Sequence, residues 1–381
     1  MAKKIKIGVD IRDLRISKTG ARTYLEEICR EFSKEEDVFD FVFLDTSLPV
    51  YTGKNKLFKL VEHTRFFAWK QCVLPLKAIF LNCDIIFCTD YFVPYFHPNF
   101  ITIPVFHDAF FWEYPQHYNR FWLKIFHGLG IAAAKRSPYI VTPTKYARKQ
   151  IALFSGLSEE KIIPILEAPK TITATLGEKQ DIQHSNDPLF SQSYLLHIGT
   201  FEKRKNLSIL IEAFDMLLQN GYPELKLVLI GQASPKKDMD DSNTIHQMIC
   251  EKKLENKILL PGYVNNDLLH LYYKHAALYV FPSLNEGFGL PVLEAFSYRV
   301  PVIIANNSCL PEIAGDGAIA FDPGNAAELS QKIKQVLDDK SMREQLIEKA
   351  SVRLSDFSWQ KTATELKALF YKAYTEKNGK Q

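Results

Sequence analysis

A short stretch near residue 290 combines acidic, glycine and apolar residues at a spacing that suits ligand binding. It runs Glu286-Gly287-Phe288-Gly289-Leu290, with Pro291 and Glu294 following. Glycines let the backbone approach a ligand closely, and the free amides at the start of a helix attract anions. Carboxylates are poor partners for phosphate but accept hydrogen bonds from sugar and ribose hydroxyls. The stretch therefore predicts a ligand with an anionic part and a polyhydroxylated part.

A strand and a helix must position these residues. Residues 277–281 form a short apolar run rich in aromatic and β-preferring side chains, which predicts a buried parallel strand. Pro291 suits the first turn of a helix. In an open α/β sheet the loop between them lies at the carboxyl end of a strand, where such folds bind ligands. We expect Glu286 in the loop and Glu294 in the first helical turn, both facing one crevice that suits a nucleotide sugar.

A cationic cluster follows another predicted strand, 194–198. The loop after this strand begins at Gly199 and contains Arg204 and Lys205. An arginine can hold a diphosphate with a bidentate fork, and a lysine can neutralise it as a point charge. A solvated charged turn is the alternative. Because the glycine and glutamate loop is expected in the same sheet, binding is the favoured interpretation.

The first half of the chain contributes His107 and Gly20. His107 ends the predicted strand 101–106, so it would point into the same inter-domain cleft from the other side; a packed histidine beside a capping aspartate is the alternative. Gly20 lies where a basic loop meets a helix that continues to about Phe32, a position that suits either phosphate approach or an ordinary turn. No GxGxxG follows the first strand, which disfavours a nicotinamide oxidoreductase.

The composition limits the class of protein. A chain of 381 residues, 46% hydrophobic and 24% charged, is long enough for two globular domains. A net charge of +3 is too near neutral to imply a nucleic-acid partner. Six cysteines without a CxxC pair predict reduced thiols in a cytosolic protein. The start carries no apolar targeting segment and no apolar run reaches about 18 residues, so we expect a soluble protein or one peripheral to a membrane.

Strand and helix patterns alternate in both halves of the chain. This predicts an α/β fold with two Rossmann-like, doubly wound parallel sheets that face a central cleft. We place a first domain at 1–170, a polar linker at 171–193 and a second domain at 194–356. A last helix, within 357–381, is expected to cross back to the first domain.

Two segments leave alternatives open. Residues 54–80 mix aromatic and aliphatic residues with Lys54, Lys56, Lys59, Arg65, Lys70 and Lys77. This pattern is typical of a helix on an anionic membrane surface, or of one that packs its apolar face on the sheet while its lysines stay solvated. Residues 238–241 read Asp-Met-Asp-Asp, a pattern that can hold a divalent metal on a diphosphate. Since no hydrophobic strand adjoins them, an exposed acidic run is the favoured interpretation.

Motifs spread over most of the chain resemble a known family when they are taken in order. They are Gly8-Val9-Asp10, Thr19-Gly20 with Tyr24, Val105-Phe106-His107-Asp108, Val141-Thr142-Pro143-Thr144, Gly199-Thr200 with Arg204-Lys205-Asn206, Leu260-Pro261-Gly262-Tyr263-Val264, Pro282-Ser283, Glu286-Gly287-Phe288-Gly289-Leu290-Pro291 with Glu294-Ala295, Pro301-Val302-Ile303, Leu310-Pro311-Glu312-Ile313 and Phe357-Ser358-Trp359. Together they are similar to glycosyltransferase family 4, the retaining enzymes of GT-B fold. The resemblance implies sugar transfer from a nucleoside diphosphate sugar, with retained configuration and without an essential metal.

The resemblance also implies roles for single residues. Glu294 would hold the ribose hydroxyls and Glu286 the donor sugar, while fixed cations would stabilise the leaving diphosphate. Backbone amides at 288–290 would contact the sugar and phosphate, and backbone around 263–264 the base. The predicted catalytic residues are His107, Glu286, Arg204 and Lys205. The predicted donor-binding residues are Gly20, Gly199, Tyr263, Val264, Gly287, Phe288, Gly289, Leu290 and Glu294.

Two positions depart from the family pattern. Arg299 stands where the family often has glycine, so the turn is built differently or the arginine emerges near the cleft. Residues 163–169 replace the family's usual Pro-Asn-Gly turn before the linker. Neither departure touches the proposed donor residues.

We therefore expect a retaining glycosyltransferase that transfers a hexosyl group to a glycan or lipid-linked acceptor in surface polysaccharide or glycolipid assembly. The motifs Gly199-Thr200 and Arg204-Lys205-Asn206 resemble those of bacterial mannosyltransferases, which favours a mannosyl donor. The expected location is the cytoplasm, with peripheral contact to the inner membrane surface as an open interpretation. A sugar-nucleotide epimerase of GT-B fold and a non-catalytic sugar-nucleotide-binding subunit are the alternatives.

Overall fold

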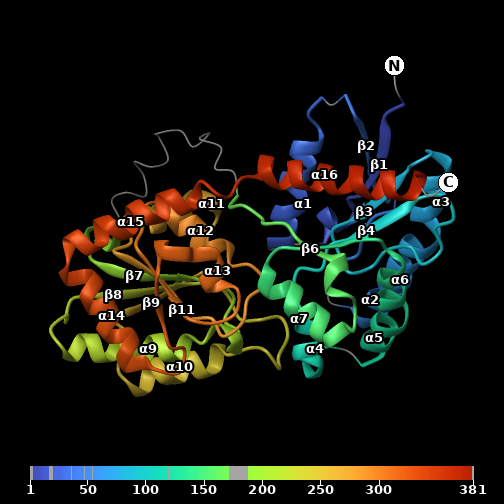
Figure 1. Ribbon diagram of the computed structural model, residues 1–381. Helices are drawn as coiled ribbons and strands as arrows, with labels where there is room; N and C mark the ends of the chain where they lie inside the picture. The colour runs from blue at the N-terminus through green and yellow to red at the C-terminus, as the bar shows by residue number, and fades with distance from the viewer. Residues whose placement is uncertain are drawn as a thin grey trace. The chain divides into compact units, whose positions relative to one another are not determined.

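The computed structural model describes residues 3–16, 20–35, 37–46, 48–53, 55–118, 120–170 and 188–379, except for the side chains of Lys56, Asn266 and Asp267. The chain divides into two compact units, each with its own parallel sheet (Figure 1). Unit 1 consists of Met1–Ala168 and Ser358–Gln381, and unit 2 of Pro169–Phe357. Most of the predicted linker, 171–187, lies outside the described residues.

The sheet of unit 1 is parallel, and its strand order reverses once. Four strands pair in the order β2 (Phe39–Leu44), β1 (Ile5–Asp10), β3 (Ile85–Cys88) and β4 (Ile101–Pro104). A parallel bridge between Val105 and Val141 leads on to the pair β5 (Ile140–Thr142) and β6 (Ile162–Pro164). The reversal lies between β1 and β3, and open α/β sheets bind ligands at the carboxyl ends of strands at such a point.

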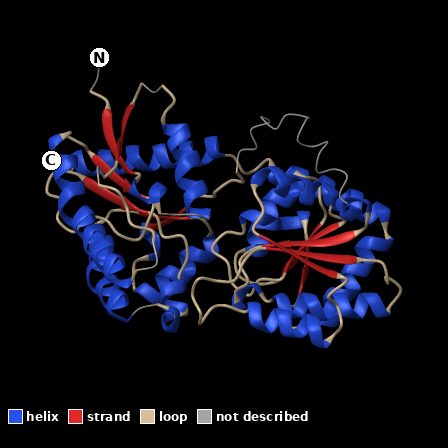
Figure 2. Ribbon diagram, turned by 180° about the vertical axis from the view of Figure 1, so that it is seen from behind, coloured by secondary structure: helices blue, strands red, loops and turns tan. Residues whose placement is uncertain are grey.

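Helices cover both faces of this sheet (Figure 2). They are η1 (Arg12–Arg15), α1 (Gly20–Phe32), α2 (Lys56–Ala68), η2 (Trp69–Val73), α3 (Leu74–Phe80), α4 (Phe110–Glu113), η3 (Pro115–His117), α5 (Arg120–Ile125), η4 (Phe126–Gly130), α6 (Ile131–Arg136), α7 (Lys145–Ser155), η5 (Glu159–Lys161) and α16 (Trp359–Asn378). On one face, α1 and α16 bring together the rings of Phe32, Phe87 and Phe370. On the other, Trp69 of η2 packs in one cluster with Ile86. Successive residues of a strand point to opposite faces of the sheet, so Ile86 packs in one core and Phe87 in the other.

The sheet of unit 2 has six parallel strands. Their order is β12 (Ile319–Phe321), β11 (Val302–Ala305), β10 (Leu278–Phe281), β7 (Tyr194–Ile198), β8 (Lys226–Ile230) and β9 (Ile258–Gly262). β10 and β7 pair through Leu278 with Leu195 and Tyr279 with Leu196. The chain path reverses between these two central strands, which makes their carboxyl ends the expected binding point of this sheet.

Helices also cover both faces of the second sheet (Figure 1). They are η6 (Pro188–Ser191), η7 (Lys203–Lys205), α9 (Leu207–Gln219), α10 (Ser242–Glu251), α11 (Asn266–His275), α12 (Leu290–Ser297), α13 (Leu310–Ala314), η8 (Gly315–Gly317), α14 (Ala326–Asp338) and α15 (Lys340–Leu354). In Figure 1, α9, α10 and α14 lie on one side of the sheet and α11, α12 and α15 on the other. The predicted α/β class with two parallel sheets is confirmed.

Most predicted elements are present, with small differences at their ends. β7 has the predicted bounds, 194–198. The helical stretch from α5 to α6 is interrupted by the π-helical turn η4. The pattern does not predict the three-residue strands β6 and β12, nor α13, α14 and α15. All six cysteines are free, and no helix in the described ranges is long and apolar enough to cross a bilayer.

The structure shows how the turn at Arg299, the first departure from the family pattern, is built. The amide of Val300 donates to the carbonyl of Ala295 and that of Arg299 to the carbonyl of Phe296, at 3.0 and 2.9 Å. This is a Schellman ending of α12, in which the residue after the cap adopts the left-handed conformation that glycine prefers. Arg299 adopts it with φ of 57°. The turn is therefore built as a glycine would build it, with an arginine under backbone strain.

Candidate functional site

The carboxyl ends of β7 and β10 bring together three predicted catalytic residues. Lys205 Nζ lies 2.5 Å from Glu286 Oε1, and Arg204 Nη1 lies 2.9 Å from Glu286 Oε2. Arg204 also pairs with Glu202 at 2.8 Å. The sequence interpretation assigned the cations and the glutamate to separate parts of a ligand. In the structure Glu286 instead fixes the position of both cations.

The charges in this cluster shift one another's proton affinity. Burial alone would raise the pKa of Glu286, but the charges of Arg204 and Lys205 outweigh burial and lower that pKa to about 2. Burial lowers the pKa of Lys205, and neighbouring Glu286 opposes this shift. Glu286 is therefore an anion throughout the neutral range and can act as a fixed acceptor for hydroxyl groups.

The glycine loop has the geometry that its sequence suggested. Gly289 precedes α12 with φ of 98°, a left-handed value that disfavours any side chain, and a Cβ there would lie 3.0 Å from Leu310. Cys309 Sγ donates to the carbonyls of Glu286 and Phe288 at 3.1 and 3.2 Å, which ties the loop to the start of α13. The amides of Phe288 and Gly289 have no hydrogen-bond acceptor in the described part of the chain. They are donors available to an anion at the start of the helix.

Glu294 lies one turn into α12 rather than in its first turn, which corrects the sequence expectation. Tyr273 donates its hydroxyl to Glu294 Oε2 at 2.9 Å. Burial raises the pKa of Glu294, and the bond from Tyr273 opposes this. Burial raises the pKa of Tyr279, and the charges of Glu294 and Glu286 raise it further.

Other predicted donor-binding residues of unit 2 lie at neighbouring strand ends. The amide of Gly199 donates to the carbonyl of Ile230 at 2.9 Å, directly after β7. Tyr263 and Val264 follow β9, two strands away, and the side chain of Tyr263 is 75% exposed. The structure does not bring these two residues into direct contact with the ionic cluster. Gly287 and Leu290 lie on either side of Gly289 in the loop and at the start of α12.

His197 is a site residue that the sequence interpretation missed. Its Nδ1 lies 2.9 Å from the carbonyl of Val280, and burial lowers its pKa to about 4. The ring is therefore neutral and donates through Nδ1, so that Nε2 is an acceptor. Within the described residues Nε2 has no partner. Polar residues inside a strand are the signal that could have found it, because burying such a group has a cost.

In unit 1, His107 follows β4 and pairs, partly buried, with the buried Glu167. His107 Nδ1 lies 3.1 Å from Glu167 Oε1, and Nε2 lies 3.0 Å from the carbonyl of Thr89. Both partners are acceptors, so the ring satisfies them together only when it is protonated. Burial alone would lower the pKa of His107, but the bond and charge of Glu167 outweigh it and raise that pKa. Tyr24 contacts the ring edge-on, with centroids 5.3 Å apart.

Glu167 belongs to the segment 163–169 that departs from the family pattern. The sequence interpretation gave it no role, because nothing in the local pattern connects residue 167 with residue 107. The structure shows that this segment supplies the carboxylate that holds the histidine.

A second buried group lies where the strand order of unit 1 reverses. Lys70 Nζ lies 2.7 Å from Asp10 and 2.6 Å from Asp90, and the indole of Trp69 donates to Asp10. Lys70 is thus buried in ion pairs, which contradicts the expectation that the lysines of 54–80 stay solvated. Burial raises the pKa of Asp90 to about 7, against the charge of Lys70. Asp13 has its pKa raised by burial and lies near enough to His107 to feel its charge.

Two further candidates from the sequence are Gly20 and the acidic run 238–241. Gly20 is the first residue of α1, and the preceding residues 17–19 lie outside the described part. The acidic run 238–241 is more ordered than an exposed run. Asp240 accepts hydrogen bonds from Ser234 and Ser242, and Asp241 is buried.

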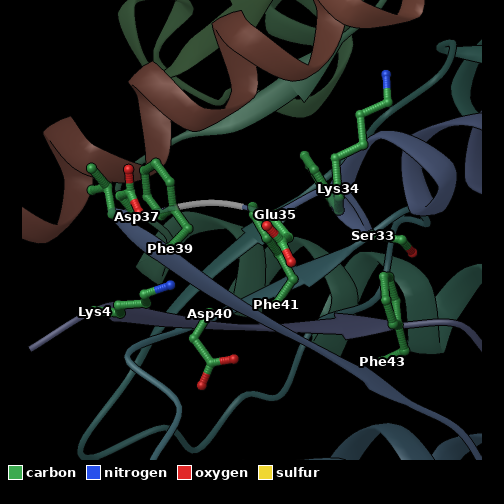
Figure 3. A pocket seen from close by; sticks show the side chains of 11 residues that line it. Lys4, Ser33, Lys34, Glu35, Asp37, Phe39, Asp40, Phe41 and Phe43 are labelled. Atoms are coloured by element: carbon green, nitrogen blue, oxygen red, sulfur yellow. The ribbon is translucent and has the colours of Figure 1, made fainter.

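A hollow of about 940 Å³ lies elsewhere, along the edge strand β2 (Figure 3). Phe39, Phe41 and Phe43 line it together with charged side chains such as Lys34 and Asp40. It contains none of the predicted site residues. It also lies along a strand edge rather than at the carboxyl ends where the polar clusters gather.

Comparisons with known proteins give a family and a fold for this chain. Residues 179–353 match the family model described as "Glycosyl transferases group 1". The chain is 28% identical over 284 residues to O-antigen chain mannosyltransferase B of Escherichia coli, across 71% of this chain and 72% of that relative. Its structure is similar to sucrose-phosphate synthase from Thermosynechococcus elongatus, with a TM-score of 0.70, 17% identity, and 98% and 100% of the two chains covered. It is also similar to Anabaena Alr3699/HepE in complex with UDP and glucose, with a TM-score of 0.68, 16% identity, and 97% and 100% covered.

Proposed function

Because this chain belongs to the glycosyl transferases group 1 family and is a glycosyltransferase, we propose that it transfers a hexosyl group from a nucleoside diphosphate sugar to a glycan or lipid-linked acceptor. The transfer retains the anomeric configuration, and mannose is the preferred sugar. The ionic cluster of Arg204, Lys205 and Glu286 at the strand-order reversal of unit 2 is the observation that carries this proposal.

The cluster suits a reaction in which a diphosphate leaves. Negative charge grows on the diphosphate as its bond to the sugar breaks, and fixed cations and amide dipoles lower that barrier. Arg204 and Lys205 are held in place by Glu286 before any ligand binds, so no reorganisation is required at the moment of reaction. The amides of Phe288 and Gly289 would add donors from the start of α12.

The two carboxylates have different tasks in this proposal. Glu286, whose pKa is about 2, would accept hydrogen bonds from hydroxyls of the donor sugar. Glu294, oriented by Tyr273, would accept from the ribose hydroxyls. The backbone at Gly199, Tyr263 and Val264 would border the diphosphate and the base.

His107 would act beside the sugar and the acceptor as a fixed positive charge. Both ring nitrogens already face protein acceptors, Glu167 and Thr89. A protonated ring so held would stabilise the negative charge that grows on the leaving diphosphate, and it has no ring proton left over for transfer. Gly20, at the start of α1, would let backbone approach the phosphates.

The donor is a mannosyl nucleotide in this proposal because the relative in Escherichia coli is an O-antigen chain mannosyltransferase. The structural neighbour Alr3699/HepE is solved with UDP and glucose, which supports a nucleoside diphosphate sugar as the class of donor. An acceptor in surface polysaccharide assembly follows from the same relative.

Isothermal titration with GDP-mannose and with UDP-glucose tests the donor site. Lys205→Met and Glu294→Gln each remove one charged partner, so we expect affinity to fall about 10-fold to 100-fold for the preferred donor. Lys203→Ala is the matched control, since Lys203 lies in the same turn but is exposed. Unchanged affinity in both site variants would contradict the assignment.

A transfer assay separates the proposal from its two alternatives. The parent is incubated with labelled donor and a glycolipid extract, and the label should move to the extract. A new sugar epimer formed from donor alone would indicate an epimerase. Donor binding without any transfer would indicate a non-catalytic subunit.

A further inference from the structure

The continuous helical run from α2 through η2 to α3 is apolar on two faces. One face packs into unit 1, where Trp69, Leu74 and Ala78 are buried. The opposite face projects outward, and near each end of the run its apolar residues are three or four positions apart. It consists of Leu57, Leu60, Val61, Val73, Leu76, Ile79 and Phe80, all exposed, with Leu76 at 65% and Phe80 at 85%. We call these seven residues the outer face. Sequence reasoning expected a single apolar face, turned either to a membrane or to the sheet.

More exposed aromatic residues lie beside the outer face. The amide of Tyr95 donates to Gln71 of η2, and Gln71 donates to the carbonyl of Val93, so this loop is tied to the same run. Phe96 next to it is 68% exposed, and Phe121 on α5 is 70% exposed.

Ring contacts connect α5 to α2. Trp122, next to Phe121, contacts Phe92, and Phe92 contacts Phe66 and Phe67 of α2. Figure 1 shows α2, α5 and α6 within the same unit. An exposed apolar surface of this extent is uncommon on a monomeric protein and marks an interaction site.

Within the helical stretches that carry this surface, 55–82 and 120–136, the exposed charge has one sign. Residues 55–82 contain one acidic residue, Glu62, which is buried and paired with Arg12, and residues 120–136 contain none. The exposed basic residues are Lys59, Arg120, Lys124, Lys135 and Arg136. Arg136 lies 4.8 Å from the ring centroid of Tyr95, which places that charge at the edge of the apolar surface.

We propose that the outer face lies on an anionic lipid bilayer, with α2 and α3 in the plane of the interface. Apolar side chains enter the boundary between headgroups and acyl chains, and the surrounding lysines and arginines pair with the anionic headgroups. A second copy of this chain is a poorer occupant. A symmetric dimer through this face would bring the same positive charges together, and the stretches 55–82 and 120–136 contain no exposed acid to pair with them.

Flotation of the full chain with vesicles tests the proposal. Vesicles of phosphatidylcholine alone are compared with an equal mixture of phosphatidylcholine and phosphatidylglycerol. The parent should bind the anionic vesicles, and Leu76→Asp and Phe80→Asp should weaken this binding at least about tenfold. Val352→Asp on α15 is the matched control, because Val352 is also 65% exposed on a helix of unit 2.

Charge reversal tests the electrostatic part. The double variant Lys59→Glu with Lys124→Glu should weaken binding to anionic vesicles at least about tenfold, since each basic residue near an anionic surface is worth roughly a fivefold change. Lys349→Glu on α15 is the control and should bind as the parent does. Circular dichroism verifies that each variant is folded.

A measurement on the parent alone keeps the test independent of the variants. Hydrogen exchange with and without anionic vesicles should show added protection in 56–80 and 120–127, and none in α15. The proposal is wrong if the parent does not bind anionic vesicles, or if added protection from exchange appears only outside 56–80 and 120–127. It is equally wrong if folded outer-face variants bind the vesicles as tightly as the parent. It is also wrong if Phe80→Asp converts a parent dimer to a monomer while vesicle binding is absent. None of these readouts depends on which sugar is transferred.

Discussion

Glu167 shows how a residue far away in the sequence sets the protonation state of another residue. It supplies a buried carboxylate to His107 from 60 positions further along the chain. The charged bond raises the pKa of the histidine although burial alone would lower it. A histidine whose pKa is raised by folding stabilises the folded state at low pH. That stability is fully present below the ordinary value of about 6.5 and is lost as the pH rises through the raised value.

Glu167→Gln should therefore lower the stability of unit 1 by about 1.5–3 kcal/mol at pH 6, and by less at pH 9. Urea unfolding followed by tryptophan fluorescence at both pH values measures this, because the four tryptophans, at 69, 112, 122 and 359, all belong to unit 1. Glu160→Gln, at an exposed glutamate nearby, is the control. A parent and a variant with the same pH dependence would show that the pair does not set the proton affinity of His107.

At this scale the sequence points to candidate residues but not to their partners. Arg204, Lys205 and Glu286 could be named because each follows a strand with a clear apolar pattern. Glu167 could not be connected to His107, since a contact over 60 positions depends on how β4, β5 and β6 align. The protein partners of a charge are a tertiary property that local spacing does not encode.

At the scale of elements, helix ends offer a direct test of backbone strain. Arg299 occupies the left-handed position at the end of α12, and Gly156 occupies the same position at the end of α7 with φ of 65°. A left-handed residue other than glycine costs about 1 kcal/mol or more, and glycine offsets part of the gain through its freedom in the unfolded chain.

Arg299→Gly should thus stabilise unit 2 by about 0.5–1 kcal/mol, whereas Gly156→Ala should destabilise unit 1 by about 1 kcal/mol. No atom lies within 4 Å of a Cβ placed at Gly156, so the second effect is conformational rather than a clash. Urea unfolding followed by circular dichroism reports on Arg299→Gly, and tryptophan fluorescence on Gly156→Ala. A loss of stability in Arg299→Gly would mean that the arginine side chain contributes more than the turn costs.

Element patterns explain which parts of the fold could be predicted. Strand β7 could be assigned because a mostly apolar run of five residues sets it apart from its surroundings. β6 and β12 have three residues each, too few to show a period. The run from α2 to α3 was ambiguous for the opposite reason. It is apolar on two faces, and a pattern cannot say which of two apolar faces a sheet will cover.

At the scale of the whole molecule, α16 completes a unit whose other residues precede it by a long stretch of chain. Trp359, Leu366 and Phe370 are buried in unit 1, and the ring of Phe370 lies 5.3 Å from that of Phe87. Trp359 contacts Tyr24 with centroids 5.7 Å apart, beside the ring of His107. The last helix therefore supports both the core and the surroundings of the histidine.

Phe370→Ala should lower the stability of unit 1 by about 3–5 kcal/mol, the usual cost of removing a buried aromatic ring. Tyr371→Ala, at the next and largely exposed residue, is the matched control and should change it by less than about 0.5 kcal/mol. Tryptophan fluorescence reports on unit 1. The donor affinity of unit 2, measured at a temperature where both units are folded, should be equal in both variants. Equal unfolding curves for the two variants would contradict the role assigned to α16.

The alternation of strands and helices was enough to predict two parallel α/β sheets, which is the coarsest feature of the fold. The rings that Phe370 meets, on Phe32 and Phe87, could not be inferred, because an amphipathic helix near the end of a chain can pack on many surfaces.

The position of α16 in the chain has a consequence for how the protein is made. A ribosome releases all of unit 2 before it releases the helix that covers Phe32 and Phe87. At about 5–20 residues per second, the uncovered sheet would wait roughly 10–40 s. A chain whose translation stops after unit 2 but before α16 would therefore carry a finished second unit and a first unit open to chaperones and proteases, which offers the cell a way to recognise copies that lack this helix.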